Sequence, residues 1–257
     1  MGHTRLGNLP KTQKWQEVIG LLGEGAGSAE IAAATLVASR GGLARASEDP
    51  ALIHTFWLLT QIPLSARKDS FLADLRLKGL PVSDQATLME VVGAFADAVD
   101  SHVQRSGGRT DLGEMAQLAG TETLTALVSE KANSLFGTTS ADTQRALRGF
   151  STERQFGTLA RDFFARLARR YLTYFLSREL SNHVGRDQRF RNVNQHSDFL
   201  KALDVHCKQA SRIVEDFAGE WFSKTNFKGG ITPKKASGFI RVAVEKIRDE
   251  LTRGAQP

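Results

Sequence analysis

The chain has little of what disulfide-bonded and membrane proteins require. It has one cysteine, Cys207, in 257 residues, which excludes an internal disulfide and indicates a reducing compartment, the cytoplasm. No apolar run reaches the ~18 residues that a membrane span needs. The longest candidate, Ala51 to Pro63, is interrupted by four polar residues. The N-terminal residues are polar, so we expect neither a secretory leader nor a contact with a membrane.

Motifs for catalysis, nucleotide binding and metal binding are also missing. The glycines at positions 23, 25 and 27 follow a helical pattern and lack a following Gly-Lys-Ser/Thr, which excludes a phosphate-binding loop. The residues closest to a metal set are His183, His196, His206 and Cys207, and their spacing is not a zinc pattern. We therefore predict no catalytic residue, no metal, no cofactor and no enzymatic activity, although an active site built from dispersed residues would leave no such motif.

Helical periodicity is the dominant pattern, and β-branched residues are nowhere grouped as a strand would group them. We predict an all-α, multi-helix globular bundle of about nine to eleven helices. Its longest helix should cover 151–183 and lie in the core, with Arg178 on the apolar face. The other expected helices are 15–22, 28 to about 41, 50–62, 66–78, 84–105, 111–135, one that starts at Asn194 or Ser197 and continues through Trp221, and one from Thr232-Pro233 to about Arg253.

Charge divides the chain unevenly. Residues 1–144 have 12 basic and 16 acidic side chains, a sum of −4, whereas residues 145–257 have 22 basic and 12 acidic, a sum of +10. This difference favours two helical subdomains, although one domain with a polarised surface is the alternative. The predicted division is a basic extended arm over 1–12, an acidic Ala/Leu-rich helical subdomain over 13–140 and a basic, aromatic-rich helical subdomain over 141–257.

One candidate binding site is the stretch from Arg145 to Arg191, where eleven arginines and no lysine face four acidic residues, a sum of +7. Arginine pairs bidentately with phosphates and carboxylates and stacks on aromatic rings. The stretch is therefore either a surface for an anionic partner or a helix held by internal ion pairs with the acidic first half. The candidate anion- or nucleic-acid-binding residues are Arg161, Arg166, Arg169, Arg170, Arg186, Arg189 and Arg191.

The second candidate is the segment from Trp221 to Lys235, where a glycine-containing loop meets the start of the last helix. Its lysines are Lys224, Lys228, Lys234 and Lys235. Backbone N–H groups at a helix N-terminus favour phosphate or carboxylate, so we expect Lys228, Lys234 and Lys235 to converge there. The alternative is a solvated loop before a capped helix.

Two short motifs carry a resemblance to known proteins. The segment from Gly2 to Pro10 with Trp15, and the segment from Glu220 to Ile231, resemble uncharacterised all-helical bacterial proteins from phage-defence gene neighbourhoods. The resemblance implies a role in anti-phage defence. Together with the charge polarity, it favours a non-enzymatic adaptor or structural subunit of a bacterial multi-protein assembly, with a protein partner. The alternative is a nucleic-acid-binding protein whose Arg and Lys side chains contact phosphate.

Overall fold

The computed structural model describes residues 12–132 and 139–254, and these residues form helices without a β-strand. The prediction of an all-α fold is confirmed. The α-helices are α1 (Gln13–Gly23), α2 (Ser28–Ala38), α3 (Arg40–Ala44), α4 (Pro50–Ser65), α5 (Phe71–Leu77), α6 (Leu88–Arg105), α7 (Asp111–Ala132), α8 (Ser140–Arg148), α9 (Glu153–Leu180), α10 (Val193–Ala210), α11 (Arg212–Phe227) and α12 (Pro233–Arg253). Eleven of these helices have seven or more residues, and three short 3-10 turns, η1 (Ala46–Glu48), η2 (Gly149–Ser151) and η3 (Ser181–His183), join neighbouring helices.

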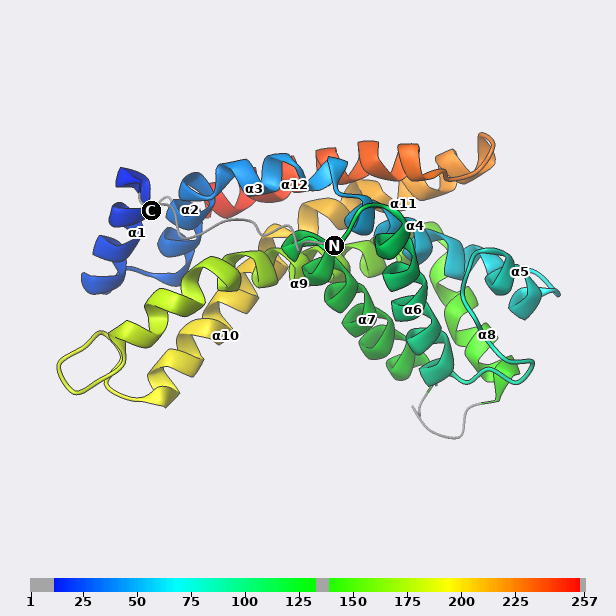
Figure 1. The fold of residues 1–257 in the computed structure, drawn as a ribbon, viewed down its shortest axis with the longest axis horizontal. Coiled ribbons are helices and arrows are strands. Elements are labelled where there is room, and N and C mark those ends of the chain that lie inside the picture. The colour runs from blue at the N-terminus through cyan, green and yellow to red at the C-terminus, as the bar shows by residue number, and fades with distance from the viewer. Residues whose placement is uncertain (1–11, 133–138, 255–257) are drawn as a thin grey trace.

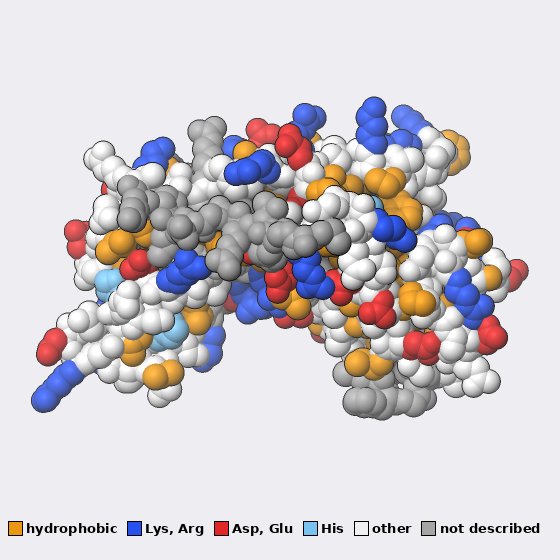
Figure 2. Space-filling view, viewed as in Figure 1, with side chains coloured by type: hydrophobic (Ala, Val, Ile, Leu, Met, Phe, Trp, Pro, Cys, Tyr) orange, Lys and Arg blue, Asp and Glu red, His pale blue; other side chains and the backbone are white. Residues whose placement is uncertain are grey.

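The helices form an arch (Figure 1). The helices α11 and α12 lie along its convex edge, and α9 crosses the middle of the molecule. On one side α10 and the second half of α9 form an arm, and on the other side α6, α7 and α8 form a second arm. The space-filling view shows a hollow between the two arms (Figure 2). No helix in the described ranges has both the length and the apolar character that crossing a bilayer requires.

The 28-residue helix α9 is the longest of the described helices, and it lies in the core as predicted. Its apolar face, which includes Phe156, Phe163 and Tyr171, is buried. The prediction that Arg178 lies on the apolar face was wrong, because Arg178 and its neighbour Ser177 are exposed. The second half of α9 extends into the arm that it forms with α10, so Arg178 faces solvent.

The core is continuous across the sequence position where charge and aromatic content change. Phe56 of α4 is fully buried, and the aromatic rings around it all come from the second half of the chain. They are Phe156, Phe163, Phe164, Trp221 and Phe239, with ring centroids 5.1 to 6.4 Å from that of Phe56. The acidic first half therefore packs directly on the aromatic second half. The predicted boundary near 140 adjoins residues 133–138, which lie outside the described ranges. The extended segment predicted over residues 1–12 also lies outside them, except for Thr12.

Two glycines allow α9 and α11 to approach each other closely. A Cβ atom on Gly157 of α9 would lie 2.8 Å from the backbone oxygen of Glu215. A Cβ on Gly219 of α11 would lie 2.8 Å from the carbonyl carbon of Glu153 and closer still to its oxygen. Each glycine thus faces the backbone of the other helix, and the nearest atoms are backbone atoms, which cannot move aside as the end of a flexible side chain could.

Capping residues explain most helix starts. Side-chain oxygens accept hydrogen bonds from backbone N–H groups at seven starts, and these residues are Thr12, Asp49, Thr87, Thr139, Thr152, Asn192 and Thr232. Thr232 and Pro233 confirm the predicted start of the last helix. At the start of α7, Thr110 Oγ1 accepts from the N–H of Gly113 at 2.8 Å.

Several predicted boundaries were wrong. The helix expected over 28 to about 41 ends at Ala38, and the glycines at 41 and 42 lie inside α3. The expected helices over 66–78 and 84–105 begin later, at Phe71 and Leu88. The helix expected to continue through Trp221 is broken at Ser211 into α10 and α11, both of which pack against α9.

Candidate functional site

Four of the candidate arginines lie on α9 and pair with carboxylates, and three of them share one carboxylate. Glu122 of α7 receives three of them. Its carboxylate lies 3.3 Å from the Arg166 guanidinium, 3.8 Å from that of Arg169, and also pairs with Arg170. One side chain of the acidic first half therefore holds three arginines of the second half.

Three more carboxylates complete this group, which we call the arginine network. Asp162 accepts from Arg166 Nε at 2.6 Å and from Thr123 Oγ1 at 2.8 Å. Asp204 of α10 lies 3.5 Å from Arg169. Glu215 of α11 lies 2.8 Å from Arg161. The network thus joins α9 to α7, α10 and α11 with four arginines and four carboxylates.

The ion pairs of the arginine network are partly buried, so they help to hold the helices together. The four arginine side chains are 22% to 39% exposed. Burial disfavours the charged form of Arg166, but hydrogen bonds from its guanidinium to Asp162 and Glu122 outweigh that effect and raise its pKa. The guanidinium charge of the network is therefore already balanced within the protein before any partner arrives.

The candidate arginines after α9 have different environments. Arg189 donates to the carbonyl oxygens of Leu21 at 3.3 Å, Leu22 at 3.1 Å and Ala26, which places a cation at the C-terminal end of α1. It also lies over the rings of Phe190 and Phe199, and burial lowers its pKa. Arg189 is therefore a structural residue, and it connects the α9–α10 turn to α1.

Arg186 and Arg191 are exposed at the end of the α9–α10 arm, and neither side chain forms an ion pair with another described residue. Val193, the first residue of α10, is 71% exposed beside them. We call these three residues the arginine end. It combines two free cations with an exposed apolar side chain.

The lysine segment forms the tip of a helical hairpin made by α11, the turn at Gly229-Gly230 and α12. Both turn glycines have positive φ angles, 92° and 85°, which L-residues with a side chain rarely adopt. The hairpin projects at the end of the molecule opposite the α9–α10 turn (Figure 1). Figure 2 shows blue Lys and Arg side chains along this edge.

Phe227 is the most exposed large apolar side chain among the described residues, at 91%. It lies between Lys224, which pairs with Glu220, and Lys228, which is exposed without an ion pair among the described residues. Lys234 is likewise exposed and unpaired within the described part of the chain. Residues 221–244 include five basic residues, the four lysines and Arg241, and no acidic residue. We call Phe227, Lys224, Lys228 and Lys234 the lysine end.

The base of the hairpin turn is fixed to α4. The carbonyl oxygen of Ile231 accepts from Trp57 Nε1 at 2.9 Å and from Gln61 Nε2 at 3.3 Å. Lys235 Nζ donates to the carbonyl of Gly230 at 2.7 Å, and the N–H of Lys235 is bonded to Thr232. Since Pro233 has no N–H, the start of α12 has few donors left for an anion. The Lys235 side chain is therefore used within the turn, whereas Lys228 and Lys234 present exposed charge.

Sequence reasoning selected the lysines but missed Phe227 as a surface residue. Phe222 and Phe227 belong to the same apparent apolar pattern, yet Phe222 is 2% exposed and Phe227 is 91% exposed. One feature of the sequence could have indicated that Phe227 is exposed: it lies at a helix end and is followed by Lys228 and two glycines. The same reasoning missed the exposed Val193 beside Arg191.

Two of the residues closest to a metal set, His206 and Cys207, pack within the fold. No group of three or more His, Cys, Asp or Glu in the described ranges is placed to hold a metal ion. Cys207 is fully buried, and burial together with nearby Asp204 raises the pKa of its thiol to about 12. His206 Nε2 lies 3.3 Å from the carbonyl oxygen of Leu251, so this ring packs against the end of α12.

A histidine pair that the sequence did not indicate lies between α4 and α6. The rings of His54 and His102 stack with centroids 4.0 Å apart and an interplanar angle of 4°. Trp57, which anchors the hairpin turn, lies 5.4 Å from His54. Burial, followed by the charges of His102 and Arg105, lowers the pKa of His54 to about 4, and burial and Arg105 lower that of His102. Both rings are therefore neutral at pH 7.

Acid should destabilise the protein through this pair. Because the folded-state pKa of His54 lies near 4 and an unfolded histidine titrates near 6.5, unfolding takes up protons between these values. The free energy of unfolding should be highest above about pH 6.5 and fall as the pH drops toward 4. Urea titrations at several pH values would measure this decline, and it should be smaller in His54→Leu. An equal decline in both proteins would contradict the assignment.

Comparisons with known proteins assign no function to these sites. No protein-family model, curated protein or solved structure matches the chain.

Proposed function

We propose that this protein is a helical adaptor, a non-catalytic structural subunit that joins partners within a multi-protein assembly. The observation that carries the proposal is the similar chemistry of the two projecting hairpin ends. Each combines unpaired cations with an exposed apolar side chain: Arg186, Arg191 and Val193 at the arginine end, Lys228, Lys234 and Phe227 at the lysine end. These ends lie at opposite extremes of the arch (Figure 1).

Such a surface suits a protein partner with acidic residues around an apolar pocket. An aromatic side chain that enters a pocket contributes far more to binding than exposed charge does, whereas surrounding charges steer the encounter. The arginine network supports this proposal as well, because its guanidinium groups are already paired with Glu122, Asp162, Asp204 and Glu215. Arg169 and Arg170 also line an open cavity of about 460 Å³, but Asp111 and Glu114 line it too, so its charge does not favour a phosphate backbone. By resemblance of the terminal motifs, we further propose that the assembly belongs to bacterial anti-phage defence.

Changing each end separately tests the adaptor proposal. We expect Phe227→Ser with Lys228→Glu to weaken binding of one purified partner by about tenfold or more, equivalent to about 1.4 kcal/mol. Arg186→Glu with Arg191→Glu should weaken binding of a different partner by a similar factor. Both double variants should melt within a few degrees of the parent protein, because the changed side chains are exposed.

Quantitative co-purification would first identify the partners, and titration calorimetry of each purified pair would then give the affinities. Lys201→Glu is the matched control, because Lys201 is an exposed lysine of α10 whose pair, Asp198, is only three residues away. The proposal is wrong if partners bind both end variants and the control with equal affinity.

Nucleic-acid binding is the second candidate, and the composition of residues 221–244 favours it. The five basic residues of this segment are unaccompanied by acidic ones, and an exposed aromatic ring can stack on an unpaired base. Binding through phosphate would weaken steeply with salt, because each neutralised phosphate releases a counterion. Fluorescence anisotropy with random single-stranded and duplex DNA from about 50 to 200 mM salt separates the candidates: strong, salt-sensitive binding that Lys228→Glu with Lys234→Glu removes would favour nucleic acid.

A further inference from the structure

A groove runs along α12 on the side that faces α2 and α3. It consists of two cavities, of about 430 Å³ and 190 Å³, which share Leu36 of α2 and Arg248 of α12. The larger cavity extends to Lys14 of α1, and the smaller one extends to Arg241. The lined part of α12, from Arg241 to Arg253, spans about 18 Å at 1.5 Å per residue. The groove therefore has the length of a short peptide segment.

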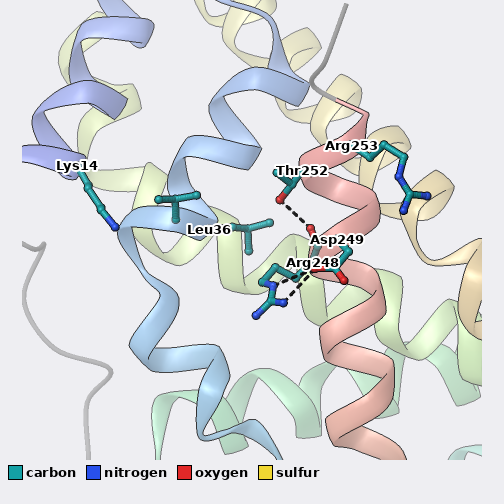
Figure 3. A pocket seen from close by; sticks show the side chains of 7 residues that line it. Lys14, Leu36, Arg248, Asp249, Thr252 and Arg253 are labelled. Carbon is teal, nitrogen blue, oxygen red and sulfur yellow. Dashed lines mark hydrogen bonds and ion pairs between the residues drawn. The ribbon is translucent and has the colours of Figure 1, made fainter.

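The groove has apolar walls and a cation at its centre. Leu36 is buried and Val37 is 44% exposed on the α2 side, while Val244 contributes from α12. Figure 3 shows Arg248 extending from α12 into the space between α12 and α2, and Lys14 extending from α1 toward α2. Both residues line the larger cavity. The arrangement presents apolar surface and positive charge to one occupant.

The cations of the groove are only weakly compensated. Arg248 pairs with its sequence neighbour Asp249 at 3.0 Å, and the Asp249 side chain is 55% exposed. Lys14 and Arg241 are exposed and form no ion pair with another described residue. Exposed pairs contribute little, so an incoming carboxylate can replace Asp249 as the partner of Arg248 at small cost.

We propose that this groove binds an acidic, amphipathic segment of a partner protein, with carboxylates on Lys14, Arg241 and Arg248 and apolar side chains against Val37 and Val244. The inference rests on the proposed adaptor function and adds a third contact surface to it. A helix laid in a groove places its apolar side chains at intervals of three and four residues, which matches a groove of this length. Arginine is the residue that best combines such apolar packing with bidentate recognition of a carboxylate.

The charge of the groove distinguishes an acidic peptide from two other possible occupants, a nucleic-acid strand and the N-terminal residues of this chain. Glu245 and Asp249 interrupt the positive charge of the groove, which suits an occupant with spaced carboxylates better than a continuous phosphate backbone. The chain's own N-terminal residues carry His3, Arg5 and Lys11 and no acidic residue, so their charge has the same sign as the groove cations. An acidic partner segment is the occupant that the charge favours.

A defined pair of peptides tests the proposal with the full chain. One is a fluorescein-labelled peptide of twelve residues with leucine at i, i+3, i+4 and i+7 and glutamate on the other face, and its match has lysine in place of glutamate. We expect the glutamate peptide to bind at least about tenfold more tightly than the lysine peptide by fluorescence anisotropy. Arg248→Glu should weaken binding of the glutamate peptide by about tenfold or more, and Val37→Asn by a smaller factor.

Lys246→Glu is the matched control, because it makes the same change of charge on α12 at an exposed residue that does not line the groove. It should change binding by less than about twofold. Equal binding of the two peptides, an unaltered affinity of Arg248→Glu, or displacement of the peptide by a single-stranded oligonucleotide of twelve nucleotides would overturn the proposal. Phe227→Ser with Lys228→Glu should still bind the glutamate peptide, so failure of the lysine end and failure of the groove are distinguishable.

Discussion

Gly219→Ala is expected to lower the free energy of unfolding by about 2–4 kcal/mol, a loss of roughly 5–15 °C in melting temperature for a chain of this size. The added methyl would overlap the backbone carbonyl of Glu153 on α9. Backbone atoms in the first turn of a 28-residue helix cannot move without shifting the helix, so α9 and α11 would have to separate. Separation would expose the stacked rings of Phe156 and Phe222, whose centroids lie 4.0 Å apart.

Gly238→Ala is the control for Gly219→Ala. Gly238 lies inside α12, is exposed, and has open space where a Cβ would be added. Alanine there should stabilise the protein by about 0.5–1 kcal/mol, because glycine loses more conformational freedom in a helix. Chemical denaturation of both variants measures the contrast. Equal effects of the two substitutions would show that helix propensity, and not the close approach of α9 and α11, governs Gly219.

The fold class and the longest helix could be predicted from the sequence because they depend on local patterns. Residues that are close in sequence determine both the helical periodicity over 151–183 and the helix start at Thr232-Pro233. The break at Ser211 could not be predicted, since no glycine or proline marks it and the apolar pattern continues across it. There the chain turns so that α10 and α11 can pack on different parts of α9, which only the tertiary structure determines.

The sequence could indicate where charged residues gather, but not which of them are exposed and unpaired in the folded protein. The sequence left two interpretations of the arginine stretch open, and in the structure some of its arginines form internal ion pairs while others are exposed. Arg161 and Arg166 are paired with acids 54 and 44 residues away, whereas Arg186 and Arg191 remain exposed. Residue composition is similar along the stretch, so the distinction depends on which acidic helices approach it. The groove beside α12 has the same origin, because its walls come from α1, α2, α3 and α12.

Glu122→Lys should lower the free energy of unfolding by about 2–4 kcal/mol, because it places a fourth cation among Arg166, Arg169 and Arg170. Those guanidinium groups are partly buried, so water screens their repulsion incompletely. Asp162 and Asp204 can each retain one arginine, but Arg170 would lose the carboxylate of its described ion pair. Glu122→Gln should have a smaller effect, since it removes attraction without adding repulsion.

Glu130→Lys on the same helix is the matched control. Glu130 is exposed and pairs with no described cation, so its reversal should change stability by less than about 0.5 kcal/mol. The destabilisation by Glu122→Lys should also shrink between about 0.05 and 1 M sodium chloride, because salt screens the exposed part of the repulsion. Urea denaturation at both salt concentrations gives these values. If both reversals are equally mild, Glu122 does not hold the arginines in solution, and the guanidinium groups of α9 become available to an anionic partner after all.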